Sequence, residues 1–284
     1  MSMDRKIKYN KRSSAKLGWE PQWFGCSDFD SHLIESIKEF QLEFGLTADG
    51  LCGSVTYRRK YSERLSEKTD EVIICNDTEI PIEWGKVVLW TEPNGMAAPS
   101  GTYRRHNGPR DPRFFVNHWD VCLDSKTCFK VLKKRGISVQ FMIDNDGTIY
   151  QTMDTKHIAW HAGRSFNSSC VGVEISNAYY PKYQGWYEKR FGPRPIVKGA
   201  KVRGRSLRDH LGFYEIQKQA AAALWKAISI GHNIPLVTPT NPDGSERAET
   251  LRRSELSDYR GILHHYHLTT KKIDCGGFDI TKYL

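Results

Sequence analysis

The segment FFVNH at residues 114–118 places an apolar run directly before a histidine. A short apolar run of this kind is typical of a strand buried inside a sheet. Residues 138–143 and 148–152 flank an Asp-Asn-Asp-Gly turn and are predicted to form a hairpin. VGVEI at 171–175 and GILH at 261–264 are predicted to form two further buried strands.

Helical patterns lie between these strands. Residues 125–134 and 215–230 carry apolar side chains at helical spacing, and a glycine follows each segment. Strands and helices that alternate in this way indicate an α/β fold, with a mixed central β-sheet flanked by helices.

The N-terminal part of the chain has a different pattern. Asp28 or Asp30 can cap a helix, and Ser54 can begin a second one after an Asp-Gly turn. We expect a small all-helical module, onto which the preceding aromatic residues pack. The domain prediction is therefore a helical module at 1–70, a linker at 71–86 and a larger domain at 87–284.

The composition excludes several classes of protein. The 284 residues are 39% hydrophobic and 12% aromatic, which argues against disorder and collagen-like structure. No apolar run approaches 18 residues, so we expect no transmembrane helix, and we recognise no signal peptide. The seven cysteines show no regular spacing, which favours synthesis in a reducing compartment over a disulfide framework.

The positive charge is concentrated in one segment. The chain has 42 Lys+Arg and 33 Asp+Glu, a net charge of +9. Residues 181–210 hold nine Lys/Arg and two Asp/Glu, or +7. We expect an exposed loop here, either simply solvated or in contact with an anionic polymer or an outer-membrane surface.

Three groups of polar residues follow predicted strands and carry the candidate chemistry. They are His118, the run HHYH at 264–267 and the run KIDCGG at 272–277. Two imidazoles plus one carboxylate or thiolate can bind zinc and leave a fourth position open for water. Both Asp274 and Cys275 are candidates for the third ligand, since thiolates also bind zinc well.

Five ordered motifs together resemble a known family. They are FVNHWD (115–120), the hairpin 138–151, AWHAG (159–163), GVEISN (172–177) and the stretch 264–274. About residues 87–284 resemble the zinc-dependent N-acetylmuramoyl-L-alanine amidases. This family includes phage lysozymes of amidase type, muropeptide-recycling amidases and animal peptidoglycan-recognition proteins.

The resemblance implies roles for individual residues. Zn²⁺ would be held by His118, His264 and Asp274, with Cys275 as the rival third ligand. Glu174 would act as the catalytic base and Lys272 would stabilise the oxyanion. Three further residues would contact substrate, namely Trp160, His161 and Asn177.

Two positions depart from the family pattern. Cys275 stands where a proline usually follows the Asp ligand. Val139 stands where some phage members carry a functional tyrosine, so the base role would fall to Glu174.

The N-terminal segment resembles a second family. Phe40-Gln41 and Asp49-Gly50, with the turn and helix that follow, are similar to the short peptidoglycan-binding repeat of wall hydrolases. The resemblance implies that this module holds the enzyme on the glycan.

The expected function is hydrolysis of the amide between N-acetylmuramic acid and L-alanine of the stem peptide. A phage endolysin is the preferred interpretation: a monomer made in the host cytoplasm that acts on the cell wall after release. The alternatives are a bacterial autolysin or wall-recycling amidase, and a non-catalytic peptidoglycan receptor. Nucleic-acid binding is suggested by charge alone, and no motif accompanies it.

Overall fold

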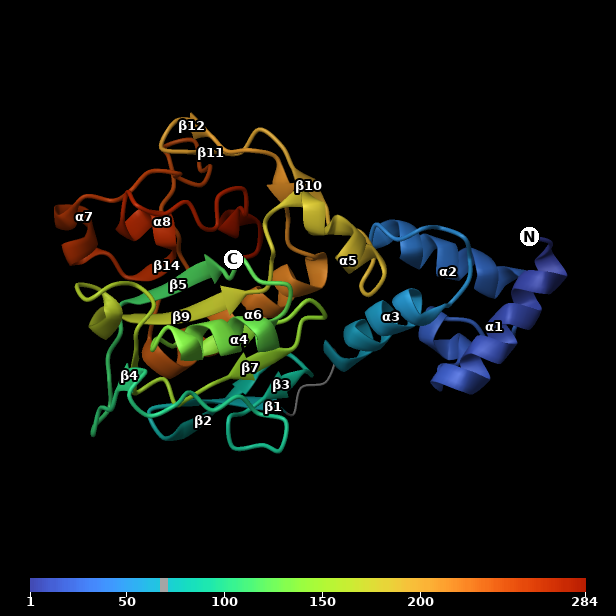
Figure 1. Cartoon of the computed structure of the whole chain (residues 1–284), viewed down its shortest axis with the longest axis horizontal. Helices are drawn as coiled ribbons and strands as arrows, with labels where there is room; N and C mark the ends of the chain where they lie inside the picture. The colour runs from blue at the N-terminus through green and yellow to red at the C-terminus, as the bar shows by residue number, and fades with distance from the viewer. Residues whose placement is uncertain (67–70) are drawn as a thin grey trace.

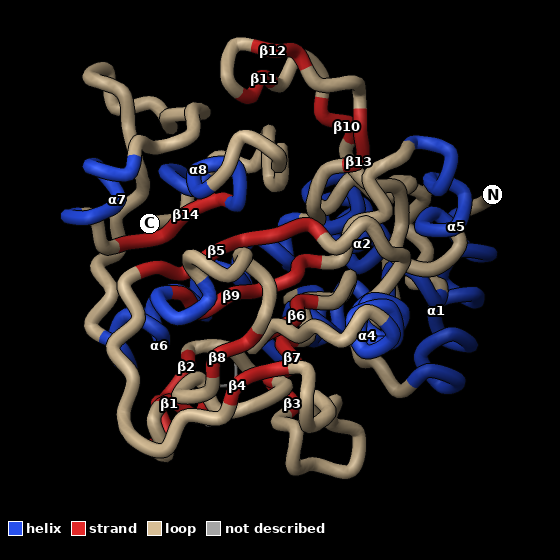
Figure 2. Tube along the Cα trace, turned by 60° about the vertical axis from the view of Figure 1, so that its left-hand side comes forward, coloured by secondary structure: helices blue, strands red, loops and turns tan. Residues whose placement is uncertain are grey.

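The computed structural model describes residues 1–66 and 71–284. A six-stranded sheet in the order β14-β5-β9-β6-β7-β3 forms the centre of the larger domain (Figure 2). Its strands are β3 (Val87–Val88), β5 (Phe114–Trp119), β6 (Phe141–Ile143), β7 (Ile149–Gln151), β9 (Cys170–Ile175) and β14 (Gly261–His264).

The sheet is mixed. The strands β14, β5, β9 and β6 run parallel, β7 is antiparallel to β6, and β3 is parallel to β7. The sequence analysis predicted this sheet and the β6–β7 hairpin. Parallel strands buried on both faces explain why the runs at 114–116 and 171–175 are almost continuously apolar.

Helices cover both faces of the sheet, which confirms the predicted fold class. Figure 1 shows α4 (Ser125–Lys134) in front of the sheet and α6 (Glu215–His232) behind it. Phe115 and Val171 belong to the core that α6 covers. Phe114 and Val116 project from the opposite face, because successive side chains of a strand alternate.

The prediction of a linker at 71–86 is wrong for the residues that the structure describes. The strands β1 (Glu71–Cys75) and β2 (Thr78–Ile82) form an antiparallel hairpin. Ile73 and Ile82 are buried in the same core as α6. The charged residues before the hairpin suggested a linker, whereas the apolar face of the hairpin makes it part of the larger domain. The predicted boundary at residue 70 lies outside the described residues.

The N-terminal module consists of three helices, α1 (Met3–Leu17), α2 (Ser31–Glu43) and α3 (Ser54–Ser66). Asp30 caps α2, accepting a hydrogen bond from the backbone N–H of Leu33. Trp19 and Phe24 are buried against α2, so the aromatics pack on the helical unit as expected. The sequence analysis did not predict α1, whose mostly charged and polar side chains give little helical periodicity.

The module is docked on the larger domain through α3. Arg59 is only 5% exposed and its guanidinium lies between two rings, 5.2 Å from Phe44 and 4.8 Å from Tyr214. Gly192 has a positive φ of 88°, and a side chain there would overlap Leu46 of the module. The two parts are therefore held together by tight packing across their boundary.

The basic segment 181–210 is not the single exposed loop that we expected. Its first half holds α5 (Gln184–Glu188) and contributes Tyr187 and Arg194 to the interior, at 0% and 2% exposed. Its second half forms the β11–β12 hairpin (Lys201–Val202 and Arg205–Ser206), where the charges are mostly exposed. No described helix has the length and apolar character needed to cross a membrane.

Candidate active site

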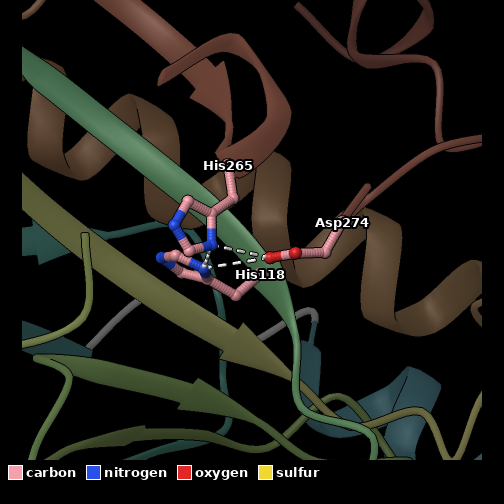
Figure 3. Close-up of side chains that lie close together, drawn as sticks. All are labelled: His118, His265 and Asp274. Carbon is pink, nitrogen blue, oxygen red and sulfur yellow. Dashed lines mark hydrogen bonds and ion pairs between the residues drawn. The ribbon is translucent and has the colours of Figure 1, made fainter. Parts of the chain in front are cut away.

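Three side chains from distant parts of the chain converge at the end of β5. His118 lies on β5, His265 begins the short helix α8 (His265–Leu268), and Asp274 lies in the loop after it (Figure 3). The Nδ1 atoms of the two histidines are 2.9 Å apart. Oδ2 of Asp274 lies 3.1 Å from Nδ1 of His118 and 3.0 Å from Nδ1 of His265. All three residues are buried.

The parallel arrangement of β14 and β5 brings these residues together. Leu263 pairs with Val116 and His264 pairs with Asn117. The next position along β14, which is His265, therefore comes level with His118. Loops that leave parallel strands at the same edge place their side chains at one site.

The protonation states of this cluster suit a metal site. Burial, and then the charge of His265, lowers the pKa of His118 to about 4. Burial alone would raise the pKa of Asp274, but hydrogen bonds from His118 and His265 hold it well below its usual value. At neutral pH the cluster therefore presents a neutral imidazole and an ionised carboxylate, the forms that bind a metal.

His264 does not join this cluster, which corrects the predicted ligand set. Its Nε2 lies 2.8 Å from the carbonyl oxygen of Phe278 and 3.2 Å from Oε1 of Glu246. The reason is strand alternation: His264 shares a face with Ile262, which is buried in the α6 core, and His118 projects from the other face. A shift of one residue therefore exchanges an interior histidine for one in the cluster.

Cys275 lies outside the cluster as well. It is fully buried in the main apolar core, and burial raises the pKa of its thiol well above the usual value. Within the described residues, the His-His-carboxylate group contains Asp274 and not Cys275.

Glu174 stands beside His118 in the sheet. The two residues are paired in the register of β5 and β9, so both project from the same face. Burial, followed by the charges of Asp120 and Asp274, raises the pKa of Glu174 well above its usual value. Its Oε2 is buried and has no hydrogen-bond partner among the described residues. This carboxylate is therefore free to accept a proton.

Lys272 precedes Asp274 by two residues and is exposed. Burial makes the largest contribution to the shifted pKa values of His118 and Glu174, and the charge of Lys272 lowers both. Its backbone carbonyl accepts a hydrogen bond of 2.8 Å from Arg203 in the β11–β12 hairpin. The basic hairpin therefore contacts the loop that carries Lys272 and Asp274.

His161 lies on the outer side of the cluster. Its Nδ1 is 2.9 Å from Nε2 of His118, and its own Nε2 is buried without a partner in the described part of the chain. The ring covers Gly172, where a side chain would overlap it. His161 and Trp160 both line a groove, and Trp160 is 36% exposed.

Asn177 does not reach this groove. It is 1% exposed, its amide donates to the carbonyl of Leu211 at 2.6 Å, and its backbone N–H donates to Asp120. This residue fixes the turn after β9, in contrast to the substrate contact that we predicted for it.

The residues of the second resemblance stabilise a turn inside the module. The amide of Gln41 donates to Oδ1 of Asp49 at 2.9 Å and accepts from the N–H of Gly50 at 2.9 Å. Phe40 is 8% exposed and packs on Phe24 at a centroid distance of 5.7 Å. These residues therefore maintain the fold of the module, and of the four only Asp49 is largely exposed.

The sequence analysis missed His265 as a member of the cluster. The run HHYH offered three histidines within four positions, and the family spacing was applied to the first. The available signal was that His264 ends the strand pattern 261–264 whereas His265 lies just beyond it.

Comparisons with known proteins agree with this site. The model of the N-acetylmuramoyl-L-alanine amidase family matches residues 108–276, which include the whole cluster and Glu174. The chain belongs to this family, and its reaction class is that of a peptidoglycan amidase. No curated protein matches.

Solved structures of low similarity include relatives of the same kind. A selenomethionine derivative of AmpD is 17% identical, with 68% of this chain and 93% of that chain covered and a TM-score of 0.37. The endolysin amidase LysCS from Clostridium intestinale is 15% identical, with 68% and 89% covered and a TM-score of 0.39. A mutant of the Drosophila recognition protein PGRP-LB is 16% identical, with 67% and 91% covered and a TM-score of 0.36.

Proposed function

We propose that this protein hydrolyses the amide between the lactyl group of N-acetylmuramic acid and L-alanine, with a zinc ion held by His118, His265 and Asp274. The supporting observation is the convergence of two Nδ1 atoms and one carboxylate oxygen at 2.9–3.1 Å. A tetrahedral zinc ion with ligand bonds of about 2.0–2.1 Å keeps its ligand atoms about 3.3 Å apart. The three atoms therefore need only a small expansion to accept the ion.

The surroundings of His118 also fit a ligand role. The contact between its Nε2 and His161 lets that nitrogen carry the proton, which leaves the Nδ1 lone pair directed at His265 and Asp274. A hydrogen bond of this kind orients a metal-binding imidazole. Bound zinc would polarise the substrate carbonyl and lower the pKa of water.

Glu174 is the general base in this proposal. Its unpartnered oxygen takes the proton of the attacking water as oxygen bonds to the amide carbon. The same carboxyl then gives the proton to the alanine nitrogen as the C–N bond breaks. The raised pKa of Glu174 supports both transfers, because a base whose pKa lies nearer to neutral can also act as the acid.

Lys272 and His161 serve the developing charge. The exposed ammonium of Lys272 is free to approach the oxyanion of the tetrahedral intermediate. The Nε2 of His161 has no partner among the described residues, so it remains available to the substrate at the mouth of the groove.

The first experiment is mass spectrometry of the products that the chelated and the zinc-restored protein release from purified peptidoglycan. Stem peptides with a free L-alanine amino terminus, released only with zinc, are the expected result. Intact muropeptides under both conditions, from a protein that still sediments with the wall, would instead favour a receptor.

We further propose that the N-terminal module holds the enzyme on the glycan, as in an endolysin. A groove of about 460 Å³ lies between the module and the segment that contains Gly192. Tyr9, Thr47 and Asp49 line it from one side, and Glu188 from the other. Hydroxyl, carboxylate and aromatic groups of this kind suit a neutral sugar strand.

The lysin role can be tested in cells. Protein accumulated in the cytoplasm should leave cells intact until their inner membrane is permeabilised, and rapid lysis should follow. Lysis that never follows permeabilisation, from a protein active on purified soluble muropeptides, would favour the recycling alternative.

A further inference from the structure

A groove of about 940 Å³ opens beside His161. One wall is a two-stranded ribbon formed by β4 (Tyr103–Arg104) and β8 (Ile158–Ala159). The opposite wall is the loop that follows His161 and contains Gly163 and Ser168. The groove is therefore continuous with the candidate active site.

Both walls are held in fixed positions relative to His161. In the ribbon, Tyr103 pairs with Ala159, two residues before His161. In the loop, Oδ1 of Asn167 accepts the backbone N–H of His161 at 3.2 Å and that of Ala162 at 2.8 Å. A ligand that reaches the cluster through this groove meets walls whose spacing is already set.

Three arginines line the groove: Arg104 and Arg105 from the ribbon, and Arg164 from the loop. All three are exposed. None of the lining residues that the structure describes is Asp or Glu. Within residues 1–66 and 71–284, none of the three forms an ion pair with a carboxylate.

This arrangement favours an anionic ligand. Three uncompensated guanidinium groups around one groove repel one another and concentrate negative charge there. Guanidinium groups bind carboxylates through paired, charge-assisted hydrogen bonds. Trp160 and Tyr103 add flat apolar surface, which suits a peptide lying along the groove.

We propose that Arg104, Arg105 and Arg164 select stem peptides whose residues beyond L-alanine carry free carboxylates over those in which the carboxylates are amidated. The inference rests on the proposed amidase function and specifies its substrate. Arg104 pairs with Ile158, three residues from His161, and so lies about 10 Å along the ribbon from it. An extended peptide covers that distance in about three residues.

The test compares two N-acetylmuramoyl peptides that differ only in free or amidated carboxylates. The zinc-loaded protein should show a kcat/KM at least about tenfold higher on the free form, and Arg104→Gln/Arg105→Gln/Arg164→Gln should abolish that ratio. The rate on the amidated form should stay unchanged. A control, Arg5→Gln/Lys8→Gln/Arg12→Gln, removes the same charge from exposed positions of α1 and should keep the ratio.

Equal rates of the parent protein on both peptides would overturn the proposal, and so would an equal loss on both peptides in the groove variant. Equilibrium binding, measured by calorimetry in the Glu174→Gln background, separates this proposal from the proposed reaction. Tighter binding of the free form without any hydrolysis by the parent protein would refute the reaction and retain the groove assignment. Equal binding of both forms would refute the groove assignment whatever the reaction.

Discussion

His118 and Glu174 are neighbours in the register of the parallel strands β5 and β9, and their side chains project from the same face of the sheet. This relationship places a candidate metal ligand beside a carboxylate that has a buried, unpartnered oxygen. The sheet itself therefore fixes the distance between the two groups, and the surrounding loops contribute His265 and Asp274.

Glu174→Gln should lower the rate of hydrolysis by about 10²–10⁴-fold, because it removes the proton acceptor and keeps the shape of the side chain. The metal-free variant should also be more stable than the parent protein at neutral pH. The raised pKa of Glu174 means that ionisation disfavours the folded state increasingly as pH rises above the unfolded value. Product release and thermal unfolding measure the two effects, and full activity in the variant would exclude Glu174 as the base.

Paired substitutions at His265 and His264 should separate metal binding from stability. His265→Ala should abolish stoichiometric zinc binding, as measured by elemental analysis of the purified protein. His264→Leu should retain zinc but lose about 1–3 kcal/mol of stability, because it leaves the buried carbonyl of Phe278 without its partner. If His264→Leu loses the metal and His265→Ala retains it, the assignment of the two residues is reversed.

Removal of the metal should stop hydrolysis without unfolding the sheet. A chelator should eliminate activity and lower the melting temperature, and added zinc should restore both, because a ligand of the folded state stabilises it. His265→Ala serves as the control, since zinc should leave its melting temperature unchanged. Full activity after exhaustive chelation, with zinc absent by elemental analysis, would contradict the proposed cofactor.

His232 should make the protein sensitive to acid. Burial, followed by the charge of Arg110, lowers the pKa of His232 from 6.5 to about 4. The unfolded chain therefore binds a proton between these values that the folded chain does not, and stability falls as pH drops from about 6.5 towards 4. The slope from one such group is at most about 1.4 kcal/mol per pH unit. His232→Gln should flatten urea-unfolding stability across this window, and an unchanged slope would contradict the assignment.

Gly192→Ala should weaken the docking of the N-terminal module. The added methyl group overlaps Leu46, whereas Gly199→Ala has a similar positive φ of 69° and meets no atom within 4 Å. Both substitutions carry the strain of the left-handed backbone, so a difference between them isolates the contact. Small-angle scattering should show an expanded molecule for Gly192→Ala only. Its hydrolysis of soluble muropeptides should persist while its digestion of whole sacculi falls. Identical scattering curves for the two variants would contradict this role of Gly192.

The sequence alone predicted the fold class, the strands that carry His118 and Glu174, and the helices at 125–134 and 215–230. These features depend on local chemistry: apolar runs, helical periodicity and turn residues act over neighbouring positions. The motif order also identified the family, because spacing along the chain survives without knowledge of contacts.

Only the tertiary structure decided which side chains meet. Strand alternation places His264 in the core and His265 in the cluster, and that choice depends on the register of β14 against β5. The hairpin at 71–82 and the docking segment around Arg194 read as linker and loop, because their partners lie far away in sequence. Register and long-range packing are properties of pairs of segments, so the pattern of one segment could not determine them.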